Sequence, residues 1–290
     1  MLAENVVCPQ FFYNRGALNP QDLKIPPLAC DCHVHVLGPA ARFPFAPGRT
    51  YTPPDASIEE LLALQKRLGF ERVVIVQPSV YGTDNSCTLD ALQRLGARAR
   101  GVAVVDEKSD FAELQRLGVR GVRVNLQTGG VQDPAVAQQL LEEADARVAA
   151  RGWHVQTFTN VELIRKLDLD AFAAPLVLDH FGLPRDRDDC EVLVHLLETQ
   201  NVYVKLSGPH RLPMDPAPVV RALVAANPER CVWGSDWPHP FTRGARNPDE
   251  VQPFDPIDDA AALERLHAWV GDAALFRKIL ADNPARLYDF

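Results

Sequence analysis

The chain has 290 residues, of which 47% are hydrophobic and 23% are charged, and its formal net charge is −8. This composition is that of an ordinary globular protein with enough apolar mass for a large core. An acidic balance without any run of Lys or Arg argues against a nucleic-acid partner. No segment has the apolar length of a membrane span and the first residues do not form a secretory signal, so a cytoplasmic protein with no membrane partner is expected.

The first 27 residues show no hydrophobic periodicity and are rich in proline: Pro9, Pro20, Pro26 and Pro27. We interpret residues 1–27 as an N-terminal arm that lies on the surface or on a partner subunit, which leaves a homodimer open. Residues 28–290 are expected to form one folded unit. Six cysteines are scattered along the chain, which is typical of reduced thiols rather than of a disulfide framework.

The folded unit opens with a strand, 28–35, that ends in His33-Val34-His35. Side chains alternate along a strand, so Asp31, His33 and His35 are expected on one face. Cys30 and Cys32 then lie on the other face as packing residues. Three titratable side chains within five residues are costly to bury, and core packing gains nothing from them.

A long proline-rich loop, 38–54, follows and is a candidate active-site loop because of its length. Ser57 and Glu60 then form the sequence of a capping box, which predicts the start of a helix. From there short apolar runs alternate with helical patterns. The further predicted strands are 72–77, 99–105, 119–125, 153–158, 176–179, 202–206 and 231–234. The predicted helices between them include 110–117, 134–150, 161–167, 190–199 and 218–226.

Eight strands joined by helices within about 260 residues predict a (β/α)₈ barrel, in which parallel strands are buried on both faces. A doubly wound open sheet is the alternative. The strand number disfavours it, as does the absence of a Gly-x-Gly-x-x-Gly sequence after any strand.

Polar residues gather where the predicted strands end, and this is the end of a barrel at which active sites form. His33, His35, His180 and Asp236 are expected on one arc of the barrel mouth. Arg123 and Asn125 are expected together on the opposite side. A substrate lying across the mouth would place its reacting carbonyl near the first group and an anionic tail near Arg123.

The chain from about residue 28 to its end resembles the amidohydrolase superfamily. The resemblance rests on His33-Val34-His35, Asp179-His180-Phe181-Gly182, the segment 234–239 and the closing segment 283–288. Further similar segments, 43–45, 51–53, 83–85, 101–106 and 121–123, point to the branch that contains the pyrone-dicarboxylate and sugar lactonases.

This resemblance implies hydrolysis of a small carboxylated lactone. Asp236 would act as general base, and His33, His35 and His180 would polarise the carbonyl together with Arg123. Substrate-binding roles are implied for three more residues: Tyr51, Ser79 and Arg211.

The sequence also departs from the lactonase pattern. The lactonases have further arginines, for the second carboxylate of their substrate, where this chain has segment 127–129 and Leu183, and a tyrosine where it has Phe158. A monocarboxylate lactone, or an aldonolactone bound by Gln156 and Asn125, therefore fits as well as a pyrone dicarboxylate.

No cofactor is expected, because the lactonase branch works without metal. The alternative is one zinc held by His33, His35, His180 and Asp236. Two metals are not expected, because Arg123 or Asn125, and Gln156 or Phe158, stand where binuclear members have Lys and His. Two other functions stay open: a mononuclear-zinc decarboxylase and a barrel that binds a sugar acid without turning it over.

Overall fold

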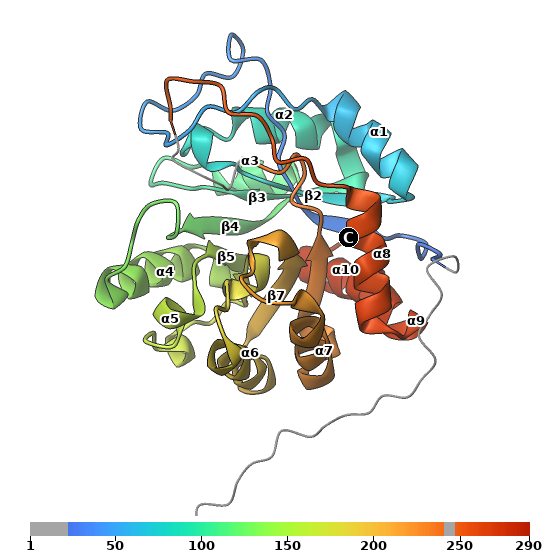
Figure 1. The fold of residues 1–290 in the computed structure, drawn as a ribbon. Coiled ribbons are helices and arrows are strands. Elements are labelled where there is room, and N and C mark those ends of the chain that lie inside the picture. The colour runs from blue at the N-terminus through green and yellow to red at the C-terminus, as the bar shows by residue number, and fades with distance from the viewer. Residues whose placement is uncertain (1–22, 241–246) are drawn as a thin grey trace, which may run out of the picture.

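The structure is a computed structural model that describes residues 23–240 and 247–290. Eight strands lie side by side in sequence order, each parallel to the next, and helices pack around the outside of the sheet (Figure 1). The expected (β/α)₈ barrel is confirmed. The expected N-terminal arm falls outside the described residues except for its last five positions.

The elements agree closely with those expected from the sequence. The strands are β1 (Cys30–Val34), β2 (Arg72–Val76), β3 (Ala99–Ala103), β4 (Val119–Asn125), β5 (His154–Phe158), β6 (Leu176–Leu178), β7 (Val202–Ser207) and β8 (Cys231–Gly234). The helices are α1 (Ile58–Leu68), α2 (Ser86–Leu95), α3 (Phe111–Arg116), α4 (Pro134–Val148), α5 (Val161–Ile164), α6 (Arg187–Thr199), α7 (Pro216–Ala226), α8 (Asp259–Val270), α9 (Ala273–Arg277) and α10 (Asn283–Tyr288). Helix α1 begins with the expected capping box, in which Ser57 and Glu60 each accept a backbone N–H.

The barrel closes between β8 and β1 through backbone hydrogen bonds of the expected site residues. The N–H of Asp236 donates to the carbonyl oxygen of His33 (2.9 Å), and the N–H of His35 donates to that of Trp237 (2.8 Å). Since these bonds join the two strand ends that carry the site, the closure of the sheet also fixes where the site residues lie. The alternative of an open sheet is wrong.

The side-chain alternation expected along β1 is wrong. Pairing with β2 is irregular between Asp31 and Val34, where three steps along β1 match two steps along β2. Cys30 and Cys32 pack against side chains of β2, β3, β6 and β8, which can meet only inside the barrel. The extra residue brings His33 to the inner side as well. Asp31 does not join the histidines, and its Oδ1 accepts the backbone N–H of Ser235 (2.9 Å).

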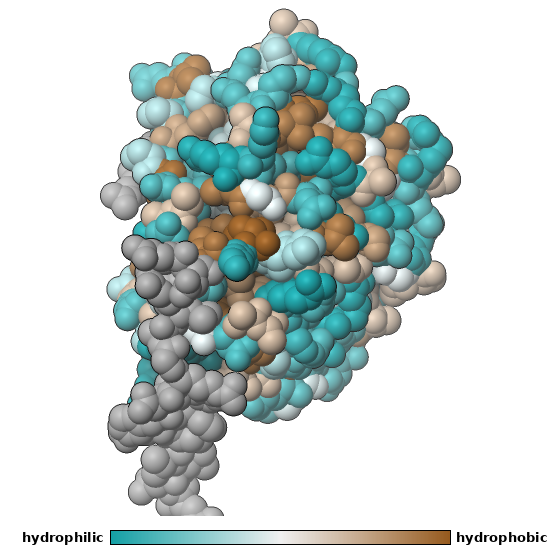
Figure 2. Space-filling model, turned by 90° about the vertical axis from the view of Figure 1, so that its right-hand side faces the viewer, coloured by the Kyte–Doolittle hydropathy of each residue, from teal (hydrophilic) through white to brown (hydrophobic). Residues whose placement is uncertain are grey.

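The molecular surface is mixed in character. Figure 2 shows the face that lies on the right-hand side of Figure 1, where hydrophilic residues surround smaller hydrophobic areas. No helix within residues 23–240 and 247–290 combines the length and hydropathy that a membrane span requires.

The contact between β8 and β1 gives a first prediction. A Cβ at Gly234 would lie 2.5 Å from the Cβ and 2.8 Å from the backbone nitrogen of His33. Gly234→Ala therefore forces the two strands apart, and we expect it to lower the free energy of unfolding by roughly 1–3 kcal/mol. Urea unfolding measures this change. Gly48→Ala is the matched control, because no atom of the described residues, apart from its chain neighbours, lies within 4 Å of its Cβ position. Equal stability of both variants would contradict the close packing.

Candidate active site

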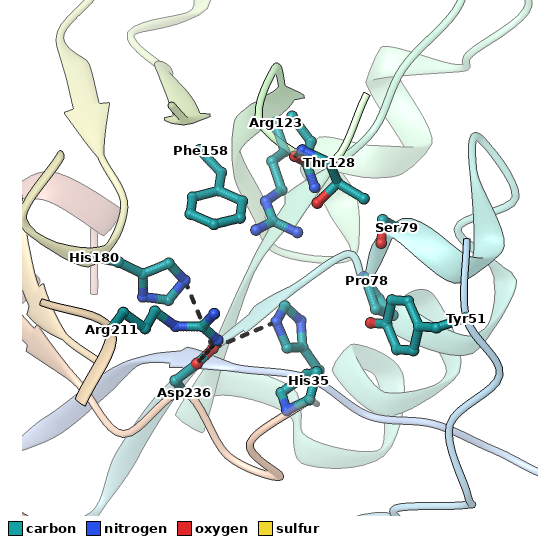
Figure 3. A pocket seen from close by; sticks show the side chains of 12 residues that line it. His35, Tyr51, Pro78, Ser79, Arg123, Thr128, Phe158, His180, Arg211 and Asp236 are labelled. Carbon is teal, nitrogen blue, oxygen red and sulfur yellow. Dashed lines mark hydrogen bonds and ion pairs between the residues drawn. The ribbon is translucent and has the colours of Figure 1, made fainter. Parts of the chain in front are cut away.

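A pocket opens at the carboxyl ends of the strands and brings together most of the residues expected there (Figure 3). It encloses about 370 Å³, counting the space that opens to solvent. The lining residues are His35, Tyr51, Pro78, Ser79, Arg123, Asn125, Thr128, Phe158, His180, Arg211, Asp236 and Pro240. The convergent polar groups suit a small polar substrate.

One oxygen of Asp236 faces three histidines. Its Oδ1 lies 3.7 Å from Nε2 of His33 and 3.8 Å from Nε2 of both His35 and His180. All four side chains are buried, and neither Asp236 Oδ1 nor His33 Nε2 has a hydrogen-bond partner among the described residues. The other oxygen, Oδ2, accepts a hydrogen bond from Arg211 Nη2 (2.5 Å). The expected arc of three histidines and one carboxylate is therefore present.

The histidine protons can be assigned from the partners of Nδ1. His35 Nδ1 lies 2.8 Å from the carbonyl oxygen of Val76, which only accepts, so this nitrogen carries the proton. His33 Nδ1 lies 3.2 Å from the Asp179 carboxylate and 3.5 Å from Lys205 Nζ. We assign its proton to Nδ1 because the carboxylate, which only accepts, is the nearer of the two groups. In the neutral rings, Nε2 of both residues is then an acceptor. His180 Nδ1 contacts the Ser207 hydroxyl (2.9 Å), which allows either tautomer.

Burial keeps these histidines neutral. Desolvation lowers the pKa of His33, lowers that of His35 to about 3 and places that of His180 well below its usual range. Burial is the largest influence on Asp236 and acts to raise its pKa, but the Arg211 guanidinium, together with His180, His33 and His35, holds the pKa of this carboxyl well below its usual range. At neutral pH the pocket therefore contains an ionised Asp236 beside neutral imidazoles.

Beneath the pocket lies a second carboxylate that sequence reasoning did not single out. Asp179 follows β6 and is fully buried. Its Oδ2 accepts from Arg123 (3.2 Å) and Gln156 (3.1 Å), and its Oδ1 lies 3.7 Å from Lys205 Nζ. Burial acts to raise the pKa of Asp179, but His33, Lys205 and Arg123 together hold it well below its usual range.

Gln156 is not where the sequence analysis expected it. The structure places it outside the pocket lining and fully buried, between Asp179 and Lys205, from whose Nζ it accepts a hydrogen bond (2.6 Å). Lys205 was missed because it occupies an inner position of a strand that otherwise reads as apolar. A charged residue in the middle of such a strand is the signal that could have found it.

The remaining expected residues meet on the opposite side of the pocket from Asp236. Arg123, Asn125, Ser79 and Tyr51 line this side, as Figure 3 shows for the labelled residues among them. Arg123 Nη1 donates to the carbonyl oxygen of Gln77 (3.1 Å), which fixes the guanidinium at the pocket floor. The pocket thus has one side around Asp236 and an opposite side around Arg123, which we call the reaction side and the binding side after the roles expected of these residues.

Some of the buried histidine and aspartate side chains are placed so that they could hold one divalent metal ion. His33, His35 and Asp236 offer ligand atoms that all lie within 4.8 Å of one another, and His33, Asp179 and His180 form a second such group. The unpartnered His33 Nε2 and Asp236 Oδ1 face the same point. A zinc held by His33, His35, His180 and Asp236 would supply Lewis-acid activation of water. The expectation that no cofactor is needed stays a prediction.

Convergent histidines and an ionised aspartate at the mouth of a (β/α)₈ barrel define the class of barrel enzymes that act on small molecules. The chain belongs to the amidohydrolase family, whose model matches residues 30–290. The resemblance noted in the sequence is thereby confirmed.

Three known proteins show how close this relation is. The chain is 39% identical to a 2-pyrone-4,6-dicarboxylate hydrolase of Comamonas testosteroni, with 91% of each chain covered. It is 37% identical to a 4-sulfomuconolactone hydrolase of Rhizobium radiobacter, with 94% of each covered. Among solved structures, a candidate 2-pyrone-4,6-dicarboxylic acid hydrolase of Acinetobacter baumannii with citric acid bound is 25% identical. Its TM-score is 0.72, and the match covers 91% of this chain and all of that one (100%).

The irregularity of β1 directs the Asp31 side chain away from the histidines. Asp31 supports the site through hydrogen bonds to the backbone. Its Oδ1 accepts the N–H of His33 (3.2 Å) and of Ser235 (2.9 Å), so it joins β1 to the segment that carries Asp236. Burial raises the pKa of Asp31 to about 7, although its hydrogen bonds with Ser235 oppose the shift.

This pKa gives a prediction for stability against pH. The folded protein binds a proton at Asp31 more tightly than the unfolded chain, so this contribution is present at low pH and is lost as the pH rises from about 4 to about 7. We expect wild type to lose up to about 4 kcal/mol relative to Asp31→Asn across this window. Urea unfolding at several pH values measures the difference. A difference that does not change with pH would contradict the assignment.

Proposed function

We propose that the protein hydrolyses the ring ester of a small lactone that carries one carboxylate, with Asp236 as general base and no metal. The two relatives described above each cover more than nine-tenths of the chain and are both hydrolases, and the chain is accordingly a hydrolase of ester bonds. The carboxylate is supported by the charges of the pocket, and the role of Asp236 by its position among the histidines.

The main support for the proposal is the net charge of the buried groups at the pocket, which carry one more positive charge than negative charges. Three cations, Arg123, Lys205 and Arg211, contact two carboxylates, Asp179 and Asp236. With neutral histidines the group has a net charge of +1, and a buried unpaired charge is costly. One carboxylate of a substrate would balance it. The citric acid bound to the Acinetobacter baumannii relative is in keeping with such a site.

The attacking water fits between the acceptors. His33 Nε2, His35 Nε2 and Asp236 Oδ1 accept hydrogen bonds, so their common neighbour has to be a donor or a cation. A water there donates its two protons to two of these atoms and turns an oxygen lone pair toward the lactone carbonyl. Its oxygen attacks the carbonyl carbon while Asp236 takes a proton, which gives a tetrahedral oxyanion.

The oxyanion needs donors, and the neutral His33 and His35 do not offer them at Nε2. Their expected role in polarising the carbonyl stays a prediction that requires a proton on Nε2. Arg123 and Arg211 each have a buried Nε without a hydrogen-bond partner among the described residues. We assign the oxyanion to the Arg211 guanidinium and to His180, which lie beside Asp236, and leave Arg123 on the opposite side of the pocket to the substrate's carboxylate. The ring C–O bond then breaks, and Asp236 returns its proton to the leaving oxygen.

The low pKa of Asp236 is compatible with this role. Arg211 is the main cationic neighbour that holds this pKa down against burial. When Arg211 turns to the oxyanion or to the substrate carboxylate, Asp236 loses its counterion in a buried site. Its pKa then rises, so the carboxylate becomes a stronger base as the reaction begins.

The charge surplus favours the metal-free reaction over the alternative of one zinc. A dication would raise the net charge of this buried group to +3, which neutral imidazole ligands do nothing to offset. The zinc-dependent decarboxylase and the barrel that only binds a sugar acid are the two competing functions.

A lactone panel tests the proposed reaction. We expect the enzyme to open the ring of carboxylated lactones, which is monitored by the release of protons, and product NMR should show the open acid. The rate should be the same after exhaustive chelation. Analogues of the same lactones in which a carboxamide replaces the carboxylate should be poor substrates, because they lack the charge that balances the pocket. Loss of turnover on chelation, restored by zinc, would favour the zinc enzyme. No hydrolysis of any lactone would refute the proposed activity.

Replacement of the general base separates hydrolysis from binding alone. Asp236→Asn should reduce kcat by roughly 10²–10⁴-fold. Steady-state kinetics measures kcat, and calorimetric binding of the product acid shows that the pocket remains intact. A binding barrel predicts no turnover in either protein, and an unchanged kcat would remove Asp236 from the mechanism.

A further inference from the structure

Lys205 is a buried lysine that the proposed reaction does not use directly. Its side chain is fully buried inside the barrel and does not line the pocket. Its Nζ donates to the carbonyl oxygen of Cys32 (2.9 Å) and to Gln156 Oε1 (2.6 Å), and it lies 3.7 Å from Asp179 Oδ1. These three neighbours accept hydrogen bonds, as an ammonium group requires. A fourth polar neighbour, His33 Nδ1, lies farther away at 3.5 Å.

Asp179 therefore has two cationic partners of different accessibility. Arg123 reaches the pocket, where it lies on the binding side, whereas Lys205 is closed off beneath it. One carboxylate can neutralise only one of them. If Lys205 were uncharged, Arg123 and Asp179 would form a neutral pair, and the pocket floor would offer no net charge to an anion.

We propose that Lys205 is a specificity-determining residue that acts through Asp179: by neutralising this carboxylate from beneath, it leaves the charge of Arg123 to the carboxylate of the substrate. The inference rests on the proposed function in that the bound anion is taken to be the substrate's carboxylate. It predicts that the affinity for an anion rises with the summed charge of Arg123, Asp179 and Lys205, whether or not Lys205 itself is present.

A charge cycle of variants tests this inference by binding alone. The probe is citrate, its affinity is measured by isothermal calorimetry, and about pH 6 is chosen because Asp31 is then largely protonated. Lys205→Met brings the group to a net charge of zero and should weaken citrate binding by roughly tenfold to a hundredfold. Asp179→Asn raises the charge to +2 and should strengthen binding. The double variant returns the charge to +1, so its affinity should return to near that of wild type.

The recovery in the double variant distinguishes charge from structure. A lysine needed only for packing would make the double variant bind no better than Lys205→Met. Lys166→Met is the matched control, because Lys166 lies on the surface beside Glu162 (3.4 Å) and its loss should leave citrate binding unchanged. If Lys205→Met alone does not fold, the same comparison is made between Asp179→Asn and the double variant, where loss of Lys205 should again weaken binding.

Two results would overturn the inference: equal citrate affinity with and without Lys205, or no citrate binding by wild type. Neither depends on turnover. A protein that follows the charge cycle but hydrolyses no lactone would refute the proposed activity and leave the role of Lys205 standing.

Discussion

The structure depends on one buried carboxylate, that of Asp179. His33, Arg123, Gln156 and Lys205 contact it from β1, β4, β5 and β7, so strands from opposite sides of the barrel meet at one group. Burying a carboxylate is costly unless it is paired and hydrogen-bonded. Here Oδ2 is hydrogen-bonded to Arg123 and Gln156, and Oδ1 lies close to His33 Nδ1 and Lys205 Nζ. The same contacts orient His33 and hold Arg123 at the pocket floor.

This arrangement explains why the pocket combines acceptors on one side with a positive charge on the other. Asp179 keeps the proton of His33 on Nδ1, and the Val76 carbonyl does the same for His35, so both rings turn a lone pair toward Asp236. In the proposed reaction, a water held among these atoms loses a proton to Asp236. The charge of Arg123 across the pocket is proposed to select an anionic substrate. In this account, the orientation of the water and the recognition of the carboxylate both depend on Asp179.

The sequence predicted the barrel because strands buried on both faces are continuous apolar runs, and it predicted the pocket residues because polar side chains at strand ends stand out. Three features escaped it for physical reasons. The irregular pairing of β1 depends on the register with β2, so it moved Asp31 away from the histidines without a local signal. Gln156 looked like a pocket residue, because sequence does not show how deep along a strand a side chain lies. Lys205 was read as part of an apolar strand, since its partners come from distant segments.

The central claim is that neutral His33 and His35 present Nε2 lone pairs to an ionised Asp236. Long-range proton–nitrogen NMR correlation of the imidazoles reads both protonation and tautomer, with His33→Gln and His35→Gln assigning the signals. The account predicts that both residues are neutral with the proton on Nδ1 from about pH 7 to about pH 8, and that His35, whose pKa is lowered to about 3, stays neutral at about pH 5. Titration of either ring near its ordinary pKa, or a proton on Nε2 in this range, would contradict it.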